Sequence, residues 1–362
     1  MLDHLRIAAT IGRHKCISVF EFIIIPAFLI TSLAVLGMTV WKATQWFALA
    51  STIQDHSPRI TAENEIMRTV AQILGGAFVL IGLYFSAKSV FVSREGQMSD
   101  RFTKALESLG DEGNINRRIG GIYALERFVR DSPRDHWRVM EILTNYLRSH
   151  APYARPDSEY ISTPIGKPPL DVLAAITVIG RRDRVYRFGE SRQLDLREIN
   201  LEGADLREAH LEGARLTGSN LRGAILYKAN LNDADLTHVI LVQANLNRVK
   251  LQRANLHGAD LRRANIREVS LKKSIFAEAN LSEASLDNSR FTDVTFSRAN
   301  LDEATLDDAV LEKCTFADAV LRGTSLRRAQ IIDAISLSPA QIKTASIDNF
   351  TKLPFIRTME GS

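Results

Sequence analysis

The chain has 362 residues, with 46 Lys and Arg against 42 Asp and Glu and a formal net charge of +4 at pH 7. A balance this close to neutral gives no argument for a nucleic-acid partner, and the length suggests about two or three domains. The two cysteines, Cys16 and Cys314, lie far apart in the chain. Their number and spacing exclude a disulfide framework and a cysteine-based zinc site.

Two apolar stretches without a charged residue, at 22–41 and 69–87, dominate residues 1–98. Each is about 20 residues long, the length of an α-helix that crosses a bilayer. Buried core helices of a soluble protein are the alternative, but neither stretch alternates with polar residues. Lys and Arg flank the pair on its outer sides, which by the positive-inside rule places both termini in the cytoplasm. The sequence therefore predicts a multi-pass membrane protein with two transmembrane helices in the lipid bilayer.

Apolar residues at helical spacing continue through residues 99–190 and predict a small α-helical module. Ser132–Pro133 is a start signal for one of its helices, because Ser caps a helix and Pro suits its first position. A proline-rich loop precedes a last short helix at 170–182. The pairs Arg117–Arg118 and Arg181–Arg182 are expected on solvated helix faces.

From residue 191 to residue 335 the chain repeats every five residues. Leu, Ile or Phe occupies every fifth position from Leu196 to Ile331, and a small residue, mostly Ala, stands two positions earlier. The run amounts to about 28 repeats, which is the scale of a solenoid. An α-helix would place successive leucines about 140° apart around its axis, and a straight strand would flip them to opposite faces. The chain therefore has to turn once in each repeat.

Four such turns would close a square coil of about 20 residues, with the large and the small residue of each side packed in a narrow interior. About seven coils at the ~4.8 Å spacing of strands make a rod roughly 34 Å long. Residues twenty apart would stack on one another. The predicted structural core column is Leu196, Leu216, Leu236, Leu256, Phe276, Phe296 and Phe316.

Segments such as GADLREAHLEGARL, at 203–216, resemble the pentapeptide-repeat family. The resemblance implies a right-handed quadrilateral β-helix. The helical module is similar to the one that precedes the repeats in membrane-anchored bacterial members, and residues 337–354 resemble their terminal cap. The residues themselves support a cap, because Ser338 to Gln341 forms a capping-box start that would let a helix cover the last coil.

The expected fold is thus mainly β. Two transmembrane helices and a small α-helical module precede the solenoid, and a short C-terminal capping helix follows it. The predicted domains are residues 1–98 for the membrane segment, 99–190 for the helical module, 191–335 for the β-helix, and 336–362 for the cap and tail.

Charged residues on the repeats form two bands, a basic one in the middle and an acidic one in the distal third. Residues twenty apart would lie on neighbouring coils, where opposite charges stabilise each other. We therefore expect ladders such as Arg263 beneath Glu283. A few stacks have no compensating charge in this register. Their residues are the candidate partner-binding set, Glu283, Asp287, Glu303, Asp307, Arg253 and Lys273.

The functional expectation is a non-catalytic, membrane-tethered scaffold or protein–protein interaction module with an unidentified protein partner. The sequence has no phosphate-binding glycine loop, no zinc-protease motif and no paired nucleophile and base, so no catalytic, metal or cofactor residue is named. Two alternatives remain open. One is a DNA-mimicking protector of a type II topoisomerase, a role that the resemblance implies for some members. The other is a regulatory subunit of a channel or transporter. A homo-oligomer through the spans or the rod end also stays open.

Overall fold

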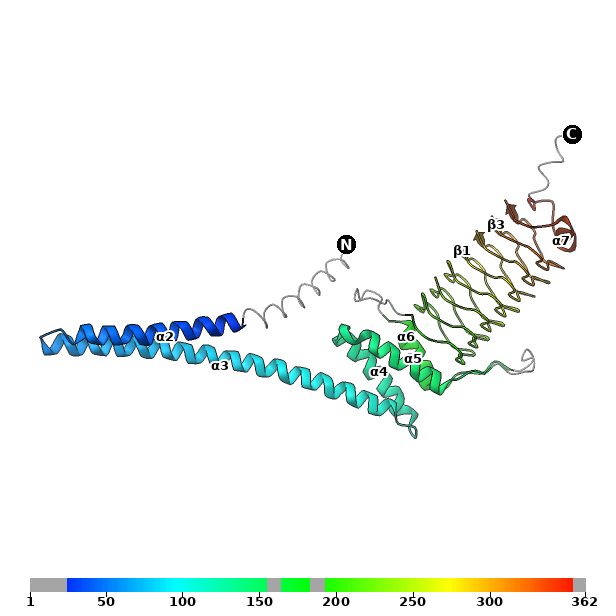
Figure 1. Cartoon of the computed structure of the whole chain (residues 1–362). Helices are drawn as coiled ribbons and strands as arrows, with labels where there is room; N and C mark the ends of the chain where they lie inside the picture. The colour runs from blue at the N-terminus through cyan, green and yellow to red at the C-terminus, as the bar shows by residue number, and fades with distance from the viewer. Residues whose placement is uncertain (1–24, 155–163, 183–192, 354–362) are drawn as a thin grey trace. The chain divides into compact units, whose positions relative to one another are not determined.

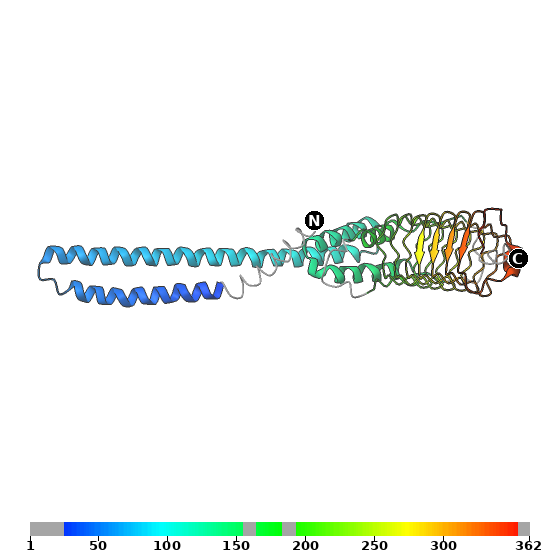
Figure 2. The ribbon, with the colours of Figure 1, turned by 90° about the horizontal axis from the view of Figure 1, so that it is seen from above.

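The computed structural model describes residues 25–154, 164–182 and 193–353. The chain divides into two compact units, Met1–Asp100 and Arg101–Ser362. The first contains helix α2 (Ile25–Ala50) and most of helix α3 (His56–Leu109), which lie side by side in both views (Figures 1 and 2). The second contains a helical module followed by a solenoid of parallel strands.

Helix α3 joins two segments that the sequence analysis treated separately. The predicted span at 69–87 and residues 99–109, the start of the predicted helical module, are parts of one continuous helix of 54 residues. Ser57–Leu109 is long and apolar enough to cross a membrane, and it is the one such helix in the described part of the chain. The other predicted span, 22–41, begins before the first described residue. Both ends of the chain also lie outside the described residues.

The helical module consists of helices α4 (Ile115–Asp131), α5 (His136–His150) and α6 (Leu170–Gly180), with a 3-10 turn η2 (Pro133–Asp135) before α5. The Asn114 side chain caps α4 by accepting from the N–H groups of Asn116 and Arg117. Glycine is required at Gly121, because a Cβ there would lie 2.7 Å from the carbonyl oxygen of Ala105 on α3. The last turns of α3 therefore pack closely against α4.

The repeats form a four-sided coil. β-Bridges link residues twenty apart in four columns that begin at Asp195, Asn200, Asp205 and His210. On the fourth side the pairing is regular enough to make a parallel four-stranded sheet in the order β1-β2-β3-β4 (Figure 2). Its strands are β1 (Ser270–Lys272), β2 (Arg290–Thr292), β3 (Val310–Glu312) and β4 (Gln330–Ile332).

Each corner of the coil depends on one residue with positive φ. Such a residue stands at every fifth position from Glu198 to Asp333. The Ala204 N–H donates to the Leu201 carbonyl (3.0 Å) across a corner whose third residue, Gly203, has φ of +66°. This combination is a type II turn. The large Leu, Ile or Phe of each repeat is called the central residue below, and Asn or Asp often precedes it. The Asn or Asp side chain stabilises the corner, because it accepts a hydrogen bond from the N–H two residues on, as Asn220 does from Arg222 (3.0 Å).

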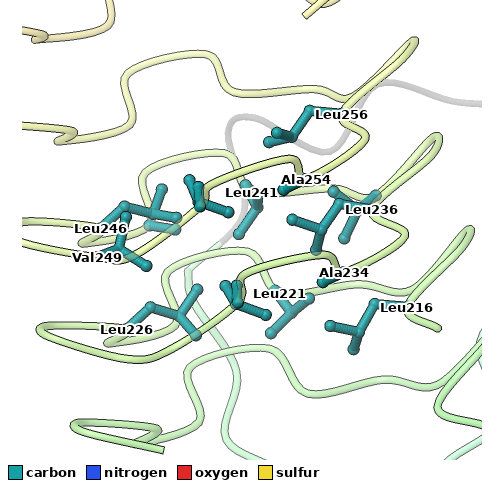
Figure 3. Close-up of a cluster of buried hydrophobic side chains, with 14 of the residues drawn as sticks. Leu216, Leu221, Leu226, Ala234, Leu236, Leu241, Leu246, Val249, Ala254 and Leu256 are labelled. Atoms are coloured by element: carbon teal, nitrogen blue, oxygen red, sulfur yellow. The ribbon is translucent and has the colours of Figure 1, made fainter. Parts of the chain in front are cut away.

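The large side chains fill the interior of the coil in stacked columns (Figure 3). Leu216, Leu236 and Leu256 lie one above another, and all seven residues of the predicted core column are buried. The Phe296 ring stacks between Phe276 and Phe316, with 5.5 Å between ring centroids on each side. The twenty-residue period is therefore visible in the contacts of the core.

Both ends of the solenoid are closed by the chain itself. At the first coil, the carbonyl groups of Ala151 and Gly180 accept from the N–H groups of Asn200 (2.8 Å) and His210 (2.7 Å). A preceding coil would otherwise supply these acceptors. The helical module thus takes the place of that coil.

At the other end, helix α7 (Pro339–Thr344) begins with the capping box predicted at Ser338. The Gln341 amide donates to the carbonyl oxygens of Phe316 and Ala319, each at 2.8 Å. The segment after α7 pairs with the last coil at Ser346 and Lys352. These bonds satisfy backbone groups that an open end would leave exposed.

The loop before α6 lies against the outside of the first two coils. The Gly166 N–H donates to the Glu202 carboxylate (3.0 Å), which also accepts from Arg222 (2.9 Å). A Cβ on Gly223 would lie 2.5 Å from the Ile165 side chain. The prolines predicted this loop, but its attachment to the rod was not predicted.

We expect Phe296→Ala to destabilise the solenoid by about 3–5 kcal/mol, because the cavity between two stacked rings cannot close. Denaturant unfolding of the full-length protein in detergent, followed by circular dichroism, measures the change. Phe350→Ala is the control, since the Phe350 side chain is 72% exposed. A loss below about 1 kcal/mol at Phe296 would contradict the stacked core.

We expect Gly223→Ala to cost about 1–3 kcal/mol more than Gly213→Ala, because only the first methyl group collides with Ile165. The two glycines are matched, with φ of +63° and +66°, and nothing lies within 4 Å of a Cβ at Gly213. The same unfolding assay measures both variants. Equal losses of stability in the two variants would show that the loop does not pack against the coil in solution.

Candidate interaction surface

Arginine–carboxylate pairs connect neighbouring coils along the outside of the rod. Each pair joins residues twenty apart, as the stacking register predicts. In Arg263–Glu283, with 2.8 Å between Nε and Oε2, the hydrogen bond from arginine lowers the pKa of the Glu283 carboxyl. Among the described residues these pairs include Arg222–Glu202, Arg248–Glu268, Arg253–Asp233, Arg263–Glu283, Arg267–Asp287, Arg298–Glu278, Arg322–Asp302 and Arg328–Asp308.

These ion pairs show that several of the six candidate partner-binding residues already have a partner within the rod. Arg253 was expected to be uncompensated beneath Lys273, but it forms a bidentate pair with Asp233, with Nε 2.6 Å from Oδ1. The expectation considered only the coil above Arg253, and the partner lies in the coil below. Glu283 and Asp287 are also neutralised, by Arg263 and Arg267.

The remaining acidic candidates differ from each other. Asp307 accepts from the Ser325 hydroxyl (2.6 Å) and from the Arg327 N–H (3.0 Å), so it has a structural role in the corner. Glu303 and Lys273 are exposed, and neither takes part in an ion pair within the described residues. The structure therefore leaves these two of the six candidates as charges open to a partner.

A buried polar cluster lies in the helical module and was not predicted. The Asp171 carboxylate accepts from Arg118 (2.7 Å) and from the Tyr146 hydroxyl (2.6 Å). Burial alone would raise the pKa of Asp171, but the hydrogen bonds from Tyr146 and Arg118 outweigh it and lower the pKa below its ordinary value. Burial, together with the bond to Asp171, raises the pKa of Tyr146. The cluster ties α4, α5 and α6 together.

Two of the four arginines expected on solvated faces are thus interior. Arg118 reaches Asp171, and Arg182 is buried and donates to the carbonyl groups of Ile179 and His210. Arg182 thereby joins the helical module to the first coil. Arg181 does lie on the surface, where it pairs with Glu126 (2.6 Å). A run of two arginines gives no signal of which one faces inward.

Chemically reactive groups in the described residues are few. Burial raises the pKa of the Cys314 thiol to about 12, and its sulfur lies 3.6 Å from the Phe291 carbonyl oxygen. A thiol that stays protonated at neutral pH is a poor nucleophile. Within residues 25–154, 164–182 and 193–353, no three His, Cys, Asp or Glu side chains are placed to hold a metal ion.

We expect Asp171→Asn to lower the stability of the helical module at neutral pH, because it leaves Arg118 without its carboxylate. The pKa of Asp171 is lowered in the folded state, so its contribution is present above the unfolded value of 3.8 and is lost as the pH falls through the folded value. The stability difference between wild type and variant should therefore shrink below pH 3.8. Denaturant unfolding across a pH series measures it, and a constant difference would contradict this role.

Comparison with known proteins places the repeats in a family. The model described as pentapeptide repeats matches in eight copies between residues 195 and 335. The solved structure of QnrB1, a plasmid-mediated fluoroquinolone resistance protein, is 18% identical with a TM-score of 0.36, over 42% of this chain and 80% of that one.

HetL, a pentapeptide repeat protein involved in heterocyst differentiation regulation in the cyanobacterium Nostoc sp. strain PCC 7120, is 28% identical with a TM-score of 0.24. That match covers 45% of this chain and 82% of HetL. No curated protein matches the chain. The four-sided coil and the eight matched copies identify residues 195–335 as a run of pentapeptide repeats.

Proposed function

We propose that the protein is a membrane-tethered, non-catalytic scaffold that presents the sides of its rod to another protein. The observation that carries the proposal is the combination of a long apolar helix with a solenoid closed at both ends. The helix supplies attachment. The solenoid supplies a large, regular surface whose backbone bonds are satisfied internally.

The surface of α3 and α2 supports attachment to a bilayer. Large apolar side chains point outward along both helices. Phe78 is 72% exposed, and Leu83 and Phe85 on α3 and Leu33 and Met38 on α2 are each more than 60% exposed. A soluble protein rarely leaves so much contiguous apolar surface in water. In a bilayer the same side chains would contact the apolar lipid tails.

The closed ends of the rod favour lateral contacts. Because the helical module covers the first coil and the segment 338–352 covers the last, the four sides are the surface left for a partner. Glu303 and Lys273 lie on these sides as exposed charges. Charges of this kind fix partner choice and register more than affinity.

The two alternatives are less well supported. DNA mimicry needs a stripe of free carboxylates, and on the distal coils Glu283, Asp302 and Asp308 are each bonded to an arginine that lowers the pKa of the carboxyl. A channel or transporter usually needs polar groups within the membrane. The predicted span at 69–87 carries no charged residue.

The experiment has two readouts on full-length protein from its native membranes. Alkaline carbonate extraction should leave the protein in the membrane pellet, and release to the supernatant would refute the tether. Affinity purification in mild detergent should co-purify a partner at fixed stoichiometry. Glu303→Gln with Lys273→Gln should weaken that capture, whereas Arg263→Gln with Glu283→Gln, which removes a self-paired couple, should not.

Equal capture by both variants would move the contact away from these charges. Absence of any stoichiometric partner would refute the scaffold itself. Protease treatment of sealed membranes tests the predicted orientation, since both ends of the chain should be on the cytoplasmic side.

A further inference from the structure

Four cations without a carboxylate partner gather on one side of the rod. Lys250, Lys272, Lys273 and Arg290 are all exposed and belong to three successive coils on the side that carries β1–β4. None of them takes part in an ion pair within the described residues, whereas eight other arginines of the rod pair with an acid twenty residues away. We call these four residues the basic patch.

The sheet register fixes how the basic patch is arranged. Ser270 pairs with Arg290, and Lys272 pairs with Thr292, on adjacent parallel strands. Lys250 lies one coil before Ser270, so Lys250 and Arg290 are two coils apart, about 10 Å at the usual strand spacing. The four exposed residues are therefore spread over three successive coils on one side of the rod.

The neighbouring acids do not cancel this charge. Asp233 is bonded to Arg253 and Glu268 to Arg248, so both already have a cation. Asp293 follows Thr292 and lies beside Lys273 in the register, and Glu312 of β3 pairs with Thr292. Within the described residues, neither acid forms an ion pair with the patch, and two acids are fewer than its four cations. The patch therefore keeps a local excess of positive charge on a rod that is otherwise nearly balanced.

Both the geometry and the residue types select the kind of partner. A small phosphate ligand would need donors gathered at one point, whereas the four residues of the basic patch are spread over three coils. Three of the four cations are lysines, whose hydrated point charges and flexible stems suit a diffuse anionic surface better than bidentate recognition. Farther along the same sheet are Val310, which is half-buried, and Ile332, which is 43% exposed. A side with lysines and nearby apolar groups matches the interface of a lipid bilayer.

We propose that the basic patch binds the anionic headgroups of the membrane that α3 enters, so that the β1–β4 side of the rod lies against the bilayer. This inference rests on the proposed membrane tether. It adds an orientation and reassigns Lys273, which would face lipid headgroups instead of a protein partner. Glu303, on the corner half a coil away, would stay on a side that a protein partner can reach.

The test measures the distance from each side of the rod to the lipid surface. Full-length protein with Cys16→Ser and Cys314→Ser receives one new cysteine for a fluorescent label, Ser270→Cys in the patch or Val320→Cys. Val320 lies half a coil, or ten residues, beyond Val310 and therefore on the opposite side. Ser already occupies positions equivalent to Cys314, such as Ser274, so that replacement fits the core. Vesicles carry an energy-transfer acceptor on their headgroups.

In vesicles that contain phosphatidylglycerol, we expect higher energy transfer from residue 270 than from residue 320. Pure phosphatidylcholine vesicles should show no such difference. Salt at about 1 M, where the Debye length is about 3 Å, should abolish it. Lys250→Gln, Lys272→Gln and Lys273→Gln together should abolish it as well. The matched control, Lys167→Gln, Lys228→Gln and Lys343→Gln, removes the same charge from exposed positions outside the sheet column of Lys250, Ser270 and Arg290, and should leave the difference intact.

Several results would overturn the inference. Equal transfer from residues 270 and 320 on anionic vesicles would do so, and so would a difference that survives the patch substitutions. If single-stranded RNA binds the detergent-solubilised protein through the patch while the vesicle difference is absent, the patch belongs to nucleic acid instead. Vesicle flotation separates the two proposals, because a protein that fails to float with either lipid refutes the tether, whereas one that floats without the difference refutes only the patch.

Discussion

The narrow interior of the coil is the constraint on which the structure depends. Each side has room for one large side chain and one small one, so Leu or Phe must recur every five residues with Ala, Ser or Cys two positions earlier. Even the polar substitutes obey this rule. The buried hydroxyls of Ser219 and Ser274 each donate to the carbonyl of the central residue one coil below, at 2.7 and 2.5 Å. A buried polar group without such a bond would be costly.

Stacking by twenty residues then determines the chemistry of the surface. Because every outward position lies directly above its counterpart in the previous coil, the sequence of charges along each column decides which side chains pair. Among the described residues, every ion pair between coils that involves Lys or Arg uses arginine, whose planar fork fits a carboxylate one coil away. Lysine is the main cation left over. The surface therefore separates into arginine–carboxylate ladders and charged residues without an ion pair, among them Glu303 and the four cations of the basic patch.

The sequence was sufficient for features that repeat and insufficient for features that occur once. The coil, the core column and the capping box at Ser338 follow from regular spacing and from a motif with a known geometry. The Arg118–Asp171–Tyr146 cluster and the loop on Gly223 depend on how distant segments meet, and no periodicity encodes that. The pairing of Arg253 lies between these cases, since the register predicted it once Asp233 in the coil below was considered.

The attraction between the basic patch and an anionic membrane is weak, so the patch would act only on a rod that is already tethered. Each Lys or Arg near an anionic membrane contributes about 1 kcal/mol, so four cations give a binding constant too small to recruit a protein from solution. A transmembrane helix changes the problem, because it holds the rod near the bilayer and makes the second contact intramolecular. Under that condition a few kcal/mol are enough to select one orientation. Under the proposed tether, the patch would select which sides of the rod a partner can reach, while the apolar helices would keep the rod at the membrane.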